Sequence, residues 1–298
     1  MVEYKHKRSI VDDALRLKGI MPTIGHLPIA QIHMGTLAPW IAERQRDGVK
    51  VGTINHGLQI VRRILNLAAS EWVDETGQTW LAHAPKIKLF PNTDRRKPYP
   101  LSWEEQDRLL ETLPPHLADM ALFAVNTGCR DAEICGLRWE WEIDVPELET
   151  FVFIVPGHAV KNGDDRLVVL NRVARTVIER RRGMHPTHVF GFRGKPVKQM
   201  LNSAWKKARA RIGLPELRVH DLKHTFGRRL RAAGVGFEDR QDLLGHRSGR
   251  ITTHYSAAEL DRLLEAADRV SESRGSRPQL LVLRGRLQRP HAKLTQAS

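Results

Sequence analysis

The sequence has few cysteines and tyrosines, and it lacks any long apolar run. Cys129 and Cys135 are the only cysteines among 298 residues, too few for a disulfide framework, so we expect two reduced thiols in a core. No segment approaches the ~18 consecutive apolar residues of a membrane-spanning helix. The first residues show neither the apolar stretch nor the small-residue cleavage site of a secretory signal. We therefore expect a cytoplasmic protein with no membrane partner.

Acidic residues are also fewer than basic residues. The chain has 48 lysines and arginines against 34 aspartates and glutamates, which gives a formal net charge of +14. Basic clusters at 180–182, 206–209 and 228–231 would repel one another unless a polyanion neutralised them. This excess favours nucleic acid as the partner, because neutralising phosphates releases counterions. A solvated basic surface or an acidic protein partner is the alternative.

Composition along the chain indicates two domains. Apolar residues that recur at helical spacing predict an all-α first domain over residues 1–92. Residues 93–100 belong to a polar, proline-rich segment, which predicts a linker. We expect a second domain over residues 101–270, followed by a basic tail over residues 271–298.

The second domain has mixed patterns. Ser102 and Glu105 have the spacing of a capping box, which predicts a helix start. β-rich runs at 151–155 and 166–170 flank a turn at 162–164 and predict a hairpin. Helical patterns occupy residues 116–138 (two helices), 172–183, 197–212, 221–233 and 257–270. The expected fold is an all-α N-terminal domain followed by a mixed, mainly α domain with a small antiparallel β-sheet.

Residues 127–133, T-G-C-R-D-A-E, predict a helix junction that carries a cation. Gly128 ends one helix and Arg130 begins the next, where free backbone N–H groups and a guanidinium can together bind a phosphate. Glu133, one turn further on, could hold that guanidinium in place. Taken alone, an ordinary junction with a surface arginine is the alternative.

Lys161 lies at the tip of the predicted hairpin, in the segment 160–166. A lysine at such a tip is usually a solvated charge. Its alternative role is to protonate the oxygen of a leaving group.

His220, Lys223 and His224 fall on one helical face, because their spacing is i, i+3 and i+4. Two histidines at this spacing also fit a metal site. The segment has no H-E-x-x-H glutamate and no evident acidic third ligand, and a structural zinc site would prefer cysteines. We therefore expect no metal ion and no other cofactor.

Tyr255 is one of three tyrosines, the others being Tyr4 and Tyr99. A lone tyrosine most often packs in a core or at its rim. Tyr255 is distinguished by its position, because it follows an L-G-H segment that ends at His246 and precedes a predicted helix. This position makes it a candidate nucleophile.

Together these segments resemble the tyrosine recombinase, or phage integrase, family. The family's signature is an ordered set: a T-G-x-R-x-x-E box, a hairpin lysine, an H-x-x-R-H box, an L-G-H box and a T-x-x-Y box. The matching residues are 127–133, Lys161, 220–224, 244–246 and 252–255. The resemblance covers residues 100–270, and the first domain resembles the family's core-binding domain more loosely. Lys223 departs from the pattern, since the family usually has an arginine there, and a lysine does not make its planar bidentate grip.

The resemblance implies transesterification at phosphorus without metal or ATP. Tyr255 would attack a DNA phosphate and carry a 3′-phosphotyrosyl bond until a 5′ hydroxyl attacks it in turn. An unperturbed tyrosine has a pKa of about 10, so the phenol needs help to lose its proton. Arg130 and Lys223 would clamp the non-bridging oxygens and stabilise the transition state.

The other matching residues have implied roles in proton transfer and support. His220 would act as acid and base near the nucleophile, and His246 would form a hydrogen bond with the phosphate. Lys161 would protonate the departing 5′ oxygen. Glu133 and His224 would support these groups.

The resemblance implies double-stranded DNA as the substrate and a homo-tetramer on two DNA sites. It leaves room for accessory DNA-bending proteins, and it implies a cytoplasmic, nucleoid-associated location. Two alternatives share many of these residues. One is a DNA-binding protein that has lost catalysis, for which Lys223 is the sequence hint. The other is a type IB topoisomerase, which relaxes DNA as a monomer.

Overall fold

The computed structural model describes residues 9–94, 96–245 and 256–272 of the chain. Two residues of the predicted site, His246 and Tyr255, lie outside these described residues. The remaining predicted site residues lie within them and can be placed.

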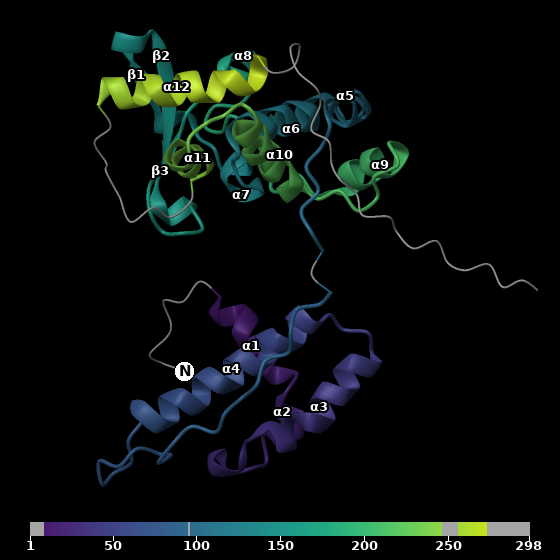
Figure 1. Ribbon diagram of the computed structural model, residues 1–298, viewed down its shortest axis with the longest axis vertical. Helices are drawn as coiled ribbons and strands as arrows, with labels where there is room; N and C mark the ends of the chain where they lie inside the picture. Colours follow the sequence, from purple (N-terminus) through teal and green to yellow (C-terminus); the bar gives the residue numbers. More distant parts are fainter. Residues whose placement is uncertain (1–8, 95, 246–255, 273–298) are drawn as a thin grey trace, which may run out of the picture. The chain divides into compact units, whose positions relative to one another are not determined.

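The structure divides into two compact units, Met1–Lys97 and Pro98–Ser298 (Figure 1). The division falls inside the segment 93–100, which the sequence marks as a linker. The predicted basic tail lies outside the described residues from position 273 onward. Over the described ranges, no helix combines the length and apolar character needed to cross a membrane.

Helices of the first unit surround one apolar core. α3 and α4 contribute Trp40, Leu58 and Leu65 to it, because their apolar residues recur every three or four positions. An isolated β-bridge joins Val73 to Thr79. The elements are α1 (Ile10–Lys18), α2 (Met21–Ile24), the 3-10 turn η2 (Ile29–Gln31), α3 (Met34–Arg46) and α4 (Val51–Ser70).

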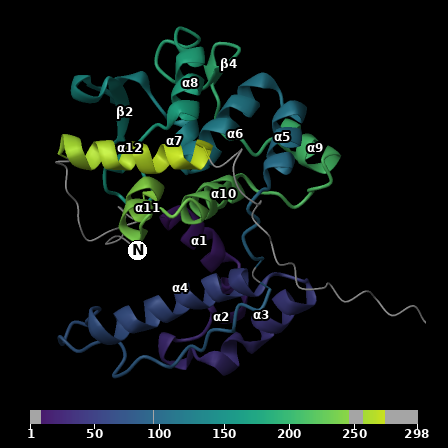
Figure 2. The same ribbon diagram turned by 45° about the horizontal axis from the view of Figure 1, so that its top comes forward.

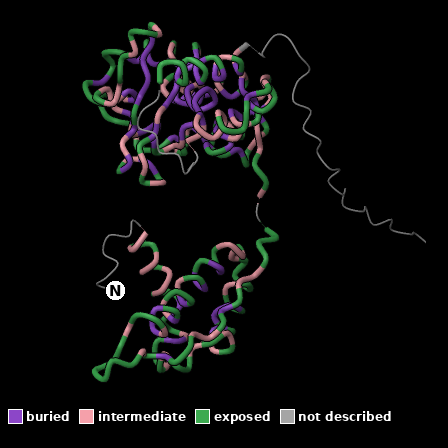
Figure 3. The backbone as a smooth tube through the Cα atoms, turned by 60° about the vertical axis from the view of Figure 1, so that its left-hand side comes forward, coloured by how far each residue is buried: buried purple, intermediate pink, exposed green. Residues whose placement is uncertain are grey.

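The second unit is mainly helical. α6 packs against both α8 and α10, and α12 packs against α6, α8, α10 and α11 (Figure 2). Buried residues run through the interior of each unit (Figure 3), and in the second unit they include Phe123, Trp205 and Phe226. The helices are α5 (Trp103–Thr112), α6 (Pro115–Thr127), α7 (Asp131–Cys135), α8 (Arg172–Arg181), α9 (Ser203–Arg211), α10 (Val219–Ala232), α11 (Phe237–Leu244) and α12 (Ala257–Glu272).

A three-stranded antiparallel sheet carries the predicted hairpin. β2 is the middle strand, buried at every position but one, and its Phe153 lies opposite Val168 of β3. The hairpin prediction is confirmed, although β3 ends at Val168. The sequence does not predict β1, because a short strand with two acidic residues is recognisable only through its pairing with β2. The strands are β1 (Glu142–Val145), β2 (Thr150–Val155) and β3 (Arg166–Val168).

The prediction of one helix over residues 197–212 was wrong in its first part. α9 begins only at Ser203, because the side chain of Asn202 accepts a hydrogen bond from the backbone N–H of Trp205 and caps the helix there. Ahead of the cap the chain forms a second small antiparallel sheet. Its strands are β4 (Gly191–Phe192) and β5 (Lys195–Pro196).

α6 and α11 both end at a glycine in the left-handed conformation, Gly128 with φ 62° and Gly245 with φ 57°. Glycine favours this conformation because it has no Cβ. At Gly128 a Cβ would also lie 2.8 Å from the ring of Phe226. The glycines of the T-G and L-G-H boxes therefore terminate helices. The sequence does not predict α11, since its eight residues are largely charged or polar.

Candidate active site

A pocket of about 630 Å³ in the second unit brings together residues from four parts of the chain. They come from the start of α7, from the β2–β3 connection, from α10 and from α11. Five of the predicted site residues line it, namely Arg130, Lys161, His220, Lys223 and His224. The pocket therefore gathers predicted site residues that are up to 94 positions apart in sequence, from Arg130 to His224.

Glu133 holds Arg130 in two ways. Its Oε2 accepts a hydrogen bond from the backbone N–H of Arg130 at 2.8 Å, which caps α7. Its Oε1 lies 2.6 Å from Nη1 of the same arginine and forms an ion pair. The spacing of three residues in the T-G-x-R-x-x-E box therefore serves both the helix start and the orientation of the guanidinium.

Arg166, the first residue of β3, is a buried residue behind the pocket that the sequence analysis did not assign to the site. It is 3% exposed and forms an ion pair with Oε2 of Glu133. Burial by itself raises the pKa of Glu133, but Arg166 and Arg130 outweigh it and leave that pKa below its usual value. The sequence feature that could have identified Arg166 is an arginine at the start of an otherwise apolar strand, because a buried charge is tolerated only when it is paired.

Lys223 lies at the base of the pocket and is 5% exposed. Its Nζ donates to the carbonyl of Gly128 at 3.0 Å and to the carbonyl of Leu244. Burial, and then the charges of Arg166 and Arg130, lower the pKa of Lys223 to about 7. In this structure both hydrogen bonds of Lys223 go to backbone carbonyls.

This lowered pKa gives a prediction about stability. The folded chain loses the Lys223 proton near pH 7, whereas the unfolded chain keeps it up to its ordinary pKa near 10.5. The unfolded state therefore binds more protons between these values, and stability rises with pH, by up to about 1.4 kcal/mol per pH unit. Urea denaturation at pH 7 and pH 9 measures this.

The control for that experiment is the Lys223→Met variant. Because it lacks the titrating amine, its free energy of unfolding should rise less between the two pH values than that of the wild type. Parallel pH profiles for the two proteins would show that Lys223 keeps an ordinary pKa.

His220 and His224 lie together on α10, with ring centroids 4.7 Å apart and ring planes nearly perpendicular. Burial, followed by His224, Lys223 and Arg130, lowers the pKa of His220 below its usual 6.5. A neutral imidazole is thus available at neutral pH to accept a proton. In the described parts of the chain, no three histidine, cysteine, aspartate or glutamate side chains gather as they would around a metal ion.

Three further cations extend the pocket beyond the predicted set. Arg228 and Arg231 lie on the same side of α10 as His224, since they follow it by four and seven residues. Arg240 comes from α11. The sequence shows Arg228 and Arg231 only as part of a charge cluster, and helical spacing from His224 was the signal that could have placed them.

The two cysteines lie on either side of α7, Cys129 just before it and Cys135 as its last residue, and both are buried and free. Cys129 directly precedes Arg130, and Cys135 donates a hydrogen bond to Asp131 at 3.3 Å. Burial raises the pKa of each thiol. The expectation of two core thiols is confirmed.

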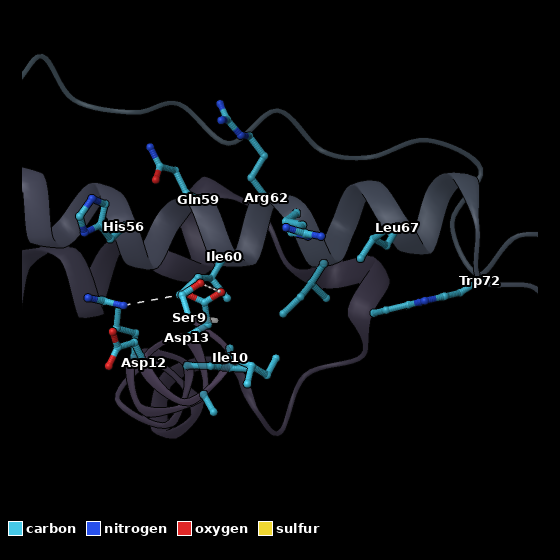
Figure 4. Close-up of a pocket in the computed structure, with 15 residues that line it drawn as sticks. Ser9, Ile10, Asp12, Asp13, His56, Gln59, Ile60, Arg62, Leu67 and Trp72 are labelled. Atoms are coloured by element: carbon cyan, nitrogen blue, oxygen red, sulfur yellow. Dashed lines mark hydrogen bonds and ion pairs between the residues drawn. The ribbon is translucent and has the colours of Figure 1, made fainter. Parts of the chain in front are cut away.

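Another pocket, of about 580 Å³, lies between α1 and α4 of the first unit. Figure 4 shows Ile10 and Asp13 on one side and Ile60 and Arg62 on the other. Its lining is mainly apolar and contains none of the residues of the ordered motifs. The pocket of the second unit is therefore the candidate active site.

Comparison with known proteins identifies the family. The sequence model of the phage integrase family matches residues 101–262. This range covers more than half of the chain and contains all the motifs described above. The chain therefore belongs to the phage integrase family, whose members are the tyrosine recombinases.

Individual relatives have low sequence identity to this chain, but they align with most of its length. The chain is 28% identical to the integrase of Salmonella phage P22 over 232 residues, which are 74% of this chain and 57% of that protein. It is also 28% identical to the tyrosine recombinase XerC of Rhodospirillum centenum over 258 residues, 79% of this chain and 71% of XerC. The chain thus spans little more than half the length of the phage P22 integrase.

Solved structures agree in fold. Lambda integrase bound to DNA superimposes with a TM-score of 0.63 at 16% identity, covering 88% of this chain and 92% of that one. Lambda integrase crystallised as a tetramer on a Holliday junction gives a TM-score of 0.59 at 14% identity, covering 84% of this chain and 74% of that one. At these identities the likeness establishes the mainly helical fold with its small antiparallel sheets.

Proposed function

We propose that the chain is a site-specific DNA recombinase that cuts and rejoins strands through a 3′-phosphotyrosyl bond at Tyr255. The observation that carries the proposal is the pocket of the second unit, where separate motifs of one ordered family signature meet. The pocket is rich in cations and histidines, which suits a phosphodiester in the transition state. The proposal is supported by relatives of the chain that are named as an integrase and as a tyrosine recombinase.

In this proposal each side chain has one task. Tyr255 forms a bond from its phenolic oxygen to phosphorus while the bond from phosphorus to the 5′ oxygen breaks. Arg130, held by Glu133, binds the non-bridging oxygens, whose negative charge grows in the transition state. His220 accepts the phenolic proton, which its lowered pKa favours at neutral pH.

The remaining groups complete the reaction. Lys161, exposed on the β2–β3 connection, donates a proton to the departing 5′ oxygen. His246 forms a hydrogen bond with the phosphate, and His224 packs against His220 and orients it. The reaction conserves the number of phosphate ester bonds, so religation by a new 5′ hydroxyl needs neither ATP nor a metal ion.

The substrate is proposed to be double-stranded DNA, bound by both units. The chain's net charge of +14 supports this, because it supplies the sequence-independent part of DNA affinity. The helical first unit takes the role of the core-binding domain. Lambda integrase, which shares the fold, forms a tetramer on a Holliday junction. We propose a homo-tetramer on two DNA sites for this chain, acting in the nucleoid.

Covalent capture tests the proposal. A DNA site is first selected by binding from randomised duplexes. It is then prepared with a nick a few nucleotides on the 3′ side of the cleaved phosphate, so that the short fragment that carries the new 5′ hydroxyl diffuses away. The wild-type chain should accumulate a covalent adduct, and peptide mapping should assign it to Tyr255. Binding without any adduct would instead indicate a DNA-binding protein that has lost catalysis.

Lys161→Ala tests the leaving-group role. Without the ammonium the 5′ oxygen must depart unprotonated, so the cleavage rate should fall by about 100-fold or more. A substrate with sulfur in place of that 5′ oxygen should be cleaved by the variant nearly as fast as by the wild type, because a thiolate leaves without a proton. Cleavage rates on the two substrates measure this, and an equal defect on both would contradict the role.

A further inference from the structure

Two buried basic side chains, Arg166 and Lys223, donate hydrogen bonds to the same two helix ends in the second unit. Nη2 of Arg166 lies 3.3 Å from the carbonyl oxygen of Thr127 and 3.4 Å from that of Leu243. Nζ of Lys223 donates to the next carbonyl in each helix, that of Gly128 at 3.0 Å and that of Leu244. Consecutive carbonyls at the ends of α6 and α11 are thus bridged by a pair of cations.

Helix ends are suitable partners for these cations. The last carbonyls of a helix have no partner within it and form the negative end of its dipole. Both helices also end in left-handed glycines, Gly128 and Gly245. At Gly245 the space that a Cβ would occupy is taken by Arg166, whose Nε would lie 2.5 Å from it. The guanidinium is therefore packed directly against the turn that ends α11.

Each helix end leads directly into the proposed catalytic machinery. Two residues after Gly128 comes Arg130, which shares Glu133 with Arg166. Gly245 is followed directly by His246, and Tyr255 comes nine residues later in the sequence. The two side chains therefore lie between the end of α6, which precedes Arg130, and the end of α11 at Gly245.

We propose that Arg166 and Lys223 are positioning residues that act as one unit, joining the α6 and α11 ends so that Arg130 and the end of α11, which precedes His246 and Tyr255 in the sequence, have a fixed separation. This inference rests on the proposed function and assigns Lys223 a role different from the family's usual arginine at its position. Lys223 binds carbonyls at the base of the pocket, and the phosphate charge is left to Arg130 and the surrounding arginines. The separation matters because a displacement of about 1 Å in a reacting group can cost about 100-fold in rate.

The test separates a positioning residue from a phosphate ligand. The variants are Arg166→Met, Lys223→Met, the double variant and Arg130→Ala, with Arg180→Met as the control for loss of an exposed arginine. Each is assayed for DNA affinity and for cleavage of two substrates, one with the normal phosphodiester and one with a neutral methylphosphonate at the cleaved position. The neutral substrate has lost the charge that a phosphate ligand would neutralise.

We expect Arg166→Met and Lys223→Met each to slow cleavage by about 100-fold while DNA affinity changes little. The double variant should be about as slow as either single variant, because residues that act as a unit are not additive. The methylphosphonate should restore cleavage by Arg130→Ala but not by the two positioning variants. If the methylphosphonate substrate restored cleavage by Lys223→Met, the proposal would be overturned. A normal cleavage rate in Arg166→Met would also overturn it.

Amide hydrogen exchange provides a readout that needs no DNA. Loss of either cation should speed exchange at residues 126–128 and at residues 243–245, and Arg180→Met should leave both unchanged. Unchanged exchange in the two positioning variants would overturn the proposal even if the wild type forms no phosphotyrosyl adduct. Absence of that adduct in the wild type would refute the recombinase function alone.

Should Arg166→Met fail to fold, Gly245→Ala replaces it. The added methyl group lies against the Arg166 guanidinium and displaces it without removing a charge. We expect the same slow cleavage and the same faster exchange at both helix ends. Wild-type behaviour of a folded Gly245→Ala variant would contradict the proposal.

Discussion

Tyr255→Phe should abolish covalent capture of DNA and leave DNA binding nearly intact. The variant loses a single oxygen atom, the one that bonds to phosphorus, so no 3′-phosphotyrosyl adduct can form at this position. DNA affinity comes mainly from cations and backbone contacts spread over the protein, which the substitution does not touch. Gel-shift titration measures the affinity, and denaturing electrophoresis of the nicked substrate measures the adduct.

Tyr99→Phe is the matched control. The hydroxyl of Tyr99 donates a hydrogen bond to Glu105 at 2.6 Å, so the variant removes the same atom from a structural tyrosine. It should retain the adduct at the wild-type level. An adduct that persists in Tyr255→Phe would mean that another residue is the nucleophile, and the assignment would fail.

Glu133→Gln should be among the most destabilising single substitutions in the second unit. Glu133 is 2% exposed, and its carboxylate pairs with both Arg130 and the buried Arg166. Glutamine keeps the shape but removes the charge, and a buried cation left without its partner costs about 3–5 kcal/mol. Urea denaturation of the full chain measures the loss. Cleavage should also slow, because Arg130 loses the group that orients it.

Glu140→Gln is the control for this substitution. Glu140 pairs with Arg138 at 3.1 Å, but both side chains are largely exposed, at 64% and 44%. Such a surface ion pair contributes about 0–1 kcal/mol. If the two variants lost equal stability, the buried pair would not hold the site together as described.

The parts of the site that the sequence predicts are those that local spacing determines. The i, i+3, i+4 pattern places His220, Lys223 and His224 on one helical face, and the pocket contains all three. The T-G-x-R-x-x-E spacing predicts that Glu133 holds Arg130, and the ion pair confirms it. The roles of these residues in catalysis stay predictions.

Arg166 could not be assigned from the sequence, because its contacts are set by tertiary packing. It meets Glu133 and Leu243, which are 33 and 77 residues away along the chain. No periodicity connects such positions. The same holds for Lys223, whose helical face was predicted but whose two carbonyl partners depend on where α6 and α11 end.

The elements of the fold also divide into those that local sequence determines and those that tertiary packing determines. The capping box at Ser102 and Glu105 and the glycine at position 128 mark real helix ends, because caps depend on a few neighbouring residues. β1 and α11 were missed, since short polar elements are stabilised by their neighbours and leave little trace in the local pattern. The helix over residues 197–212 was extended too far because the Asn202 cap was not recognised.

The two buried thiols can report transient unfolding of the second unit around α7. Cys129 and Cys135 are shielded from solvent, and burial raises the pKa of both, so the reactive thiolate is scarce while the unit stays closed. A thiol-specific dye should therefore label the native chain slowly, at a rate set by transient exposure. Since Cys129 directly precedes Arg130 and Cys135 is the last residue of α7, the labelling rate would register disturbance along α7 without any added probe.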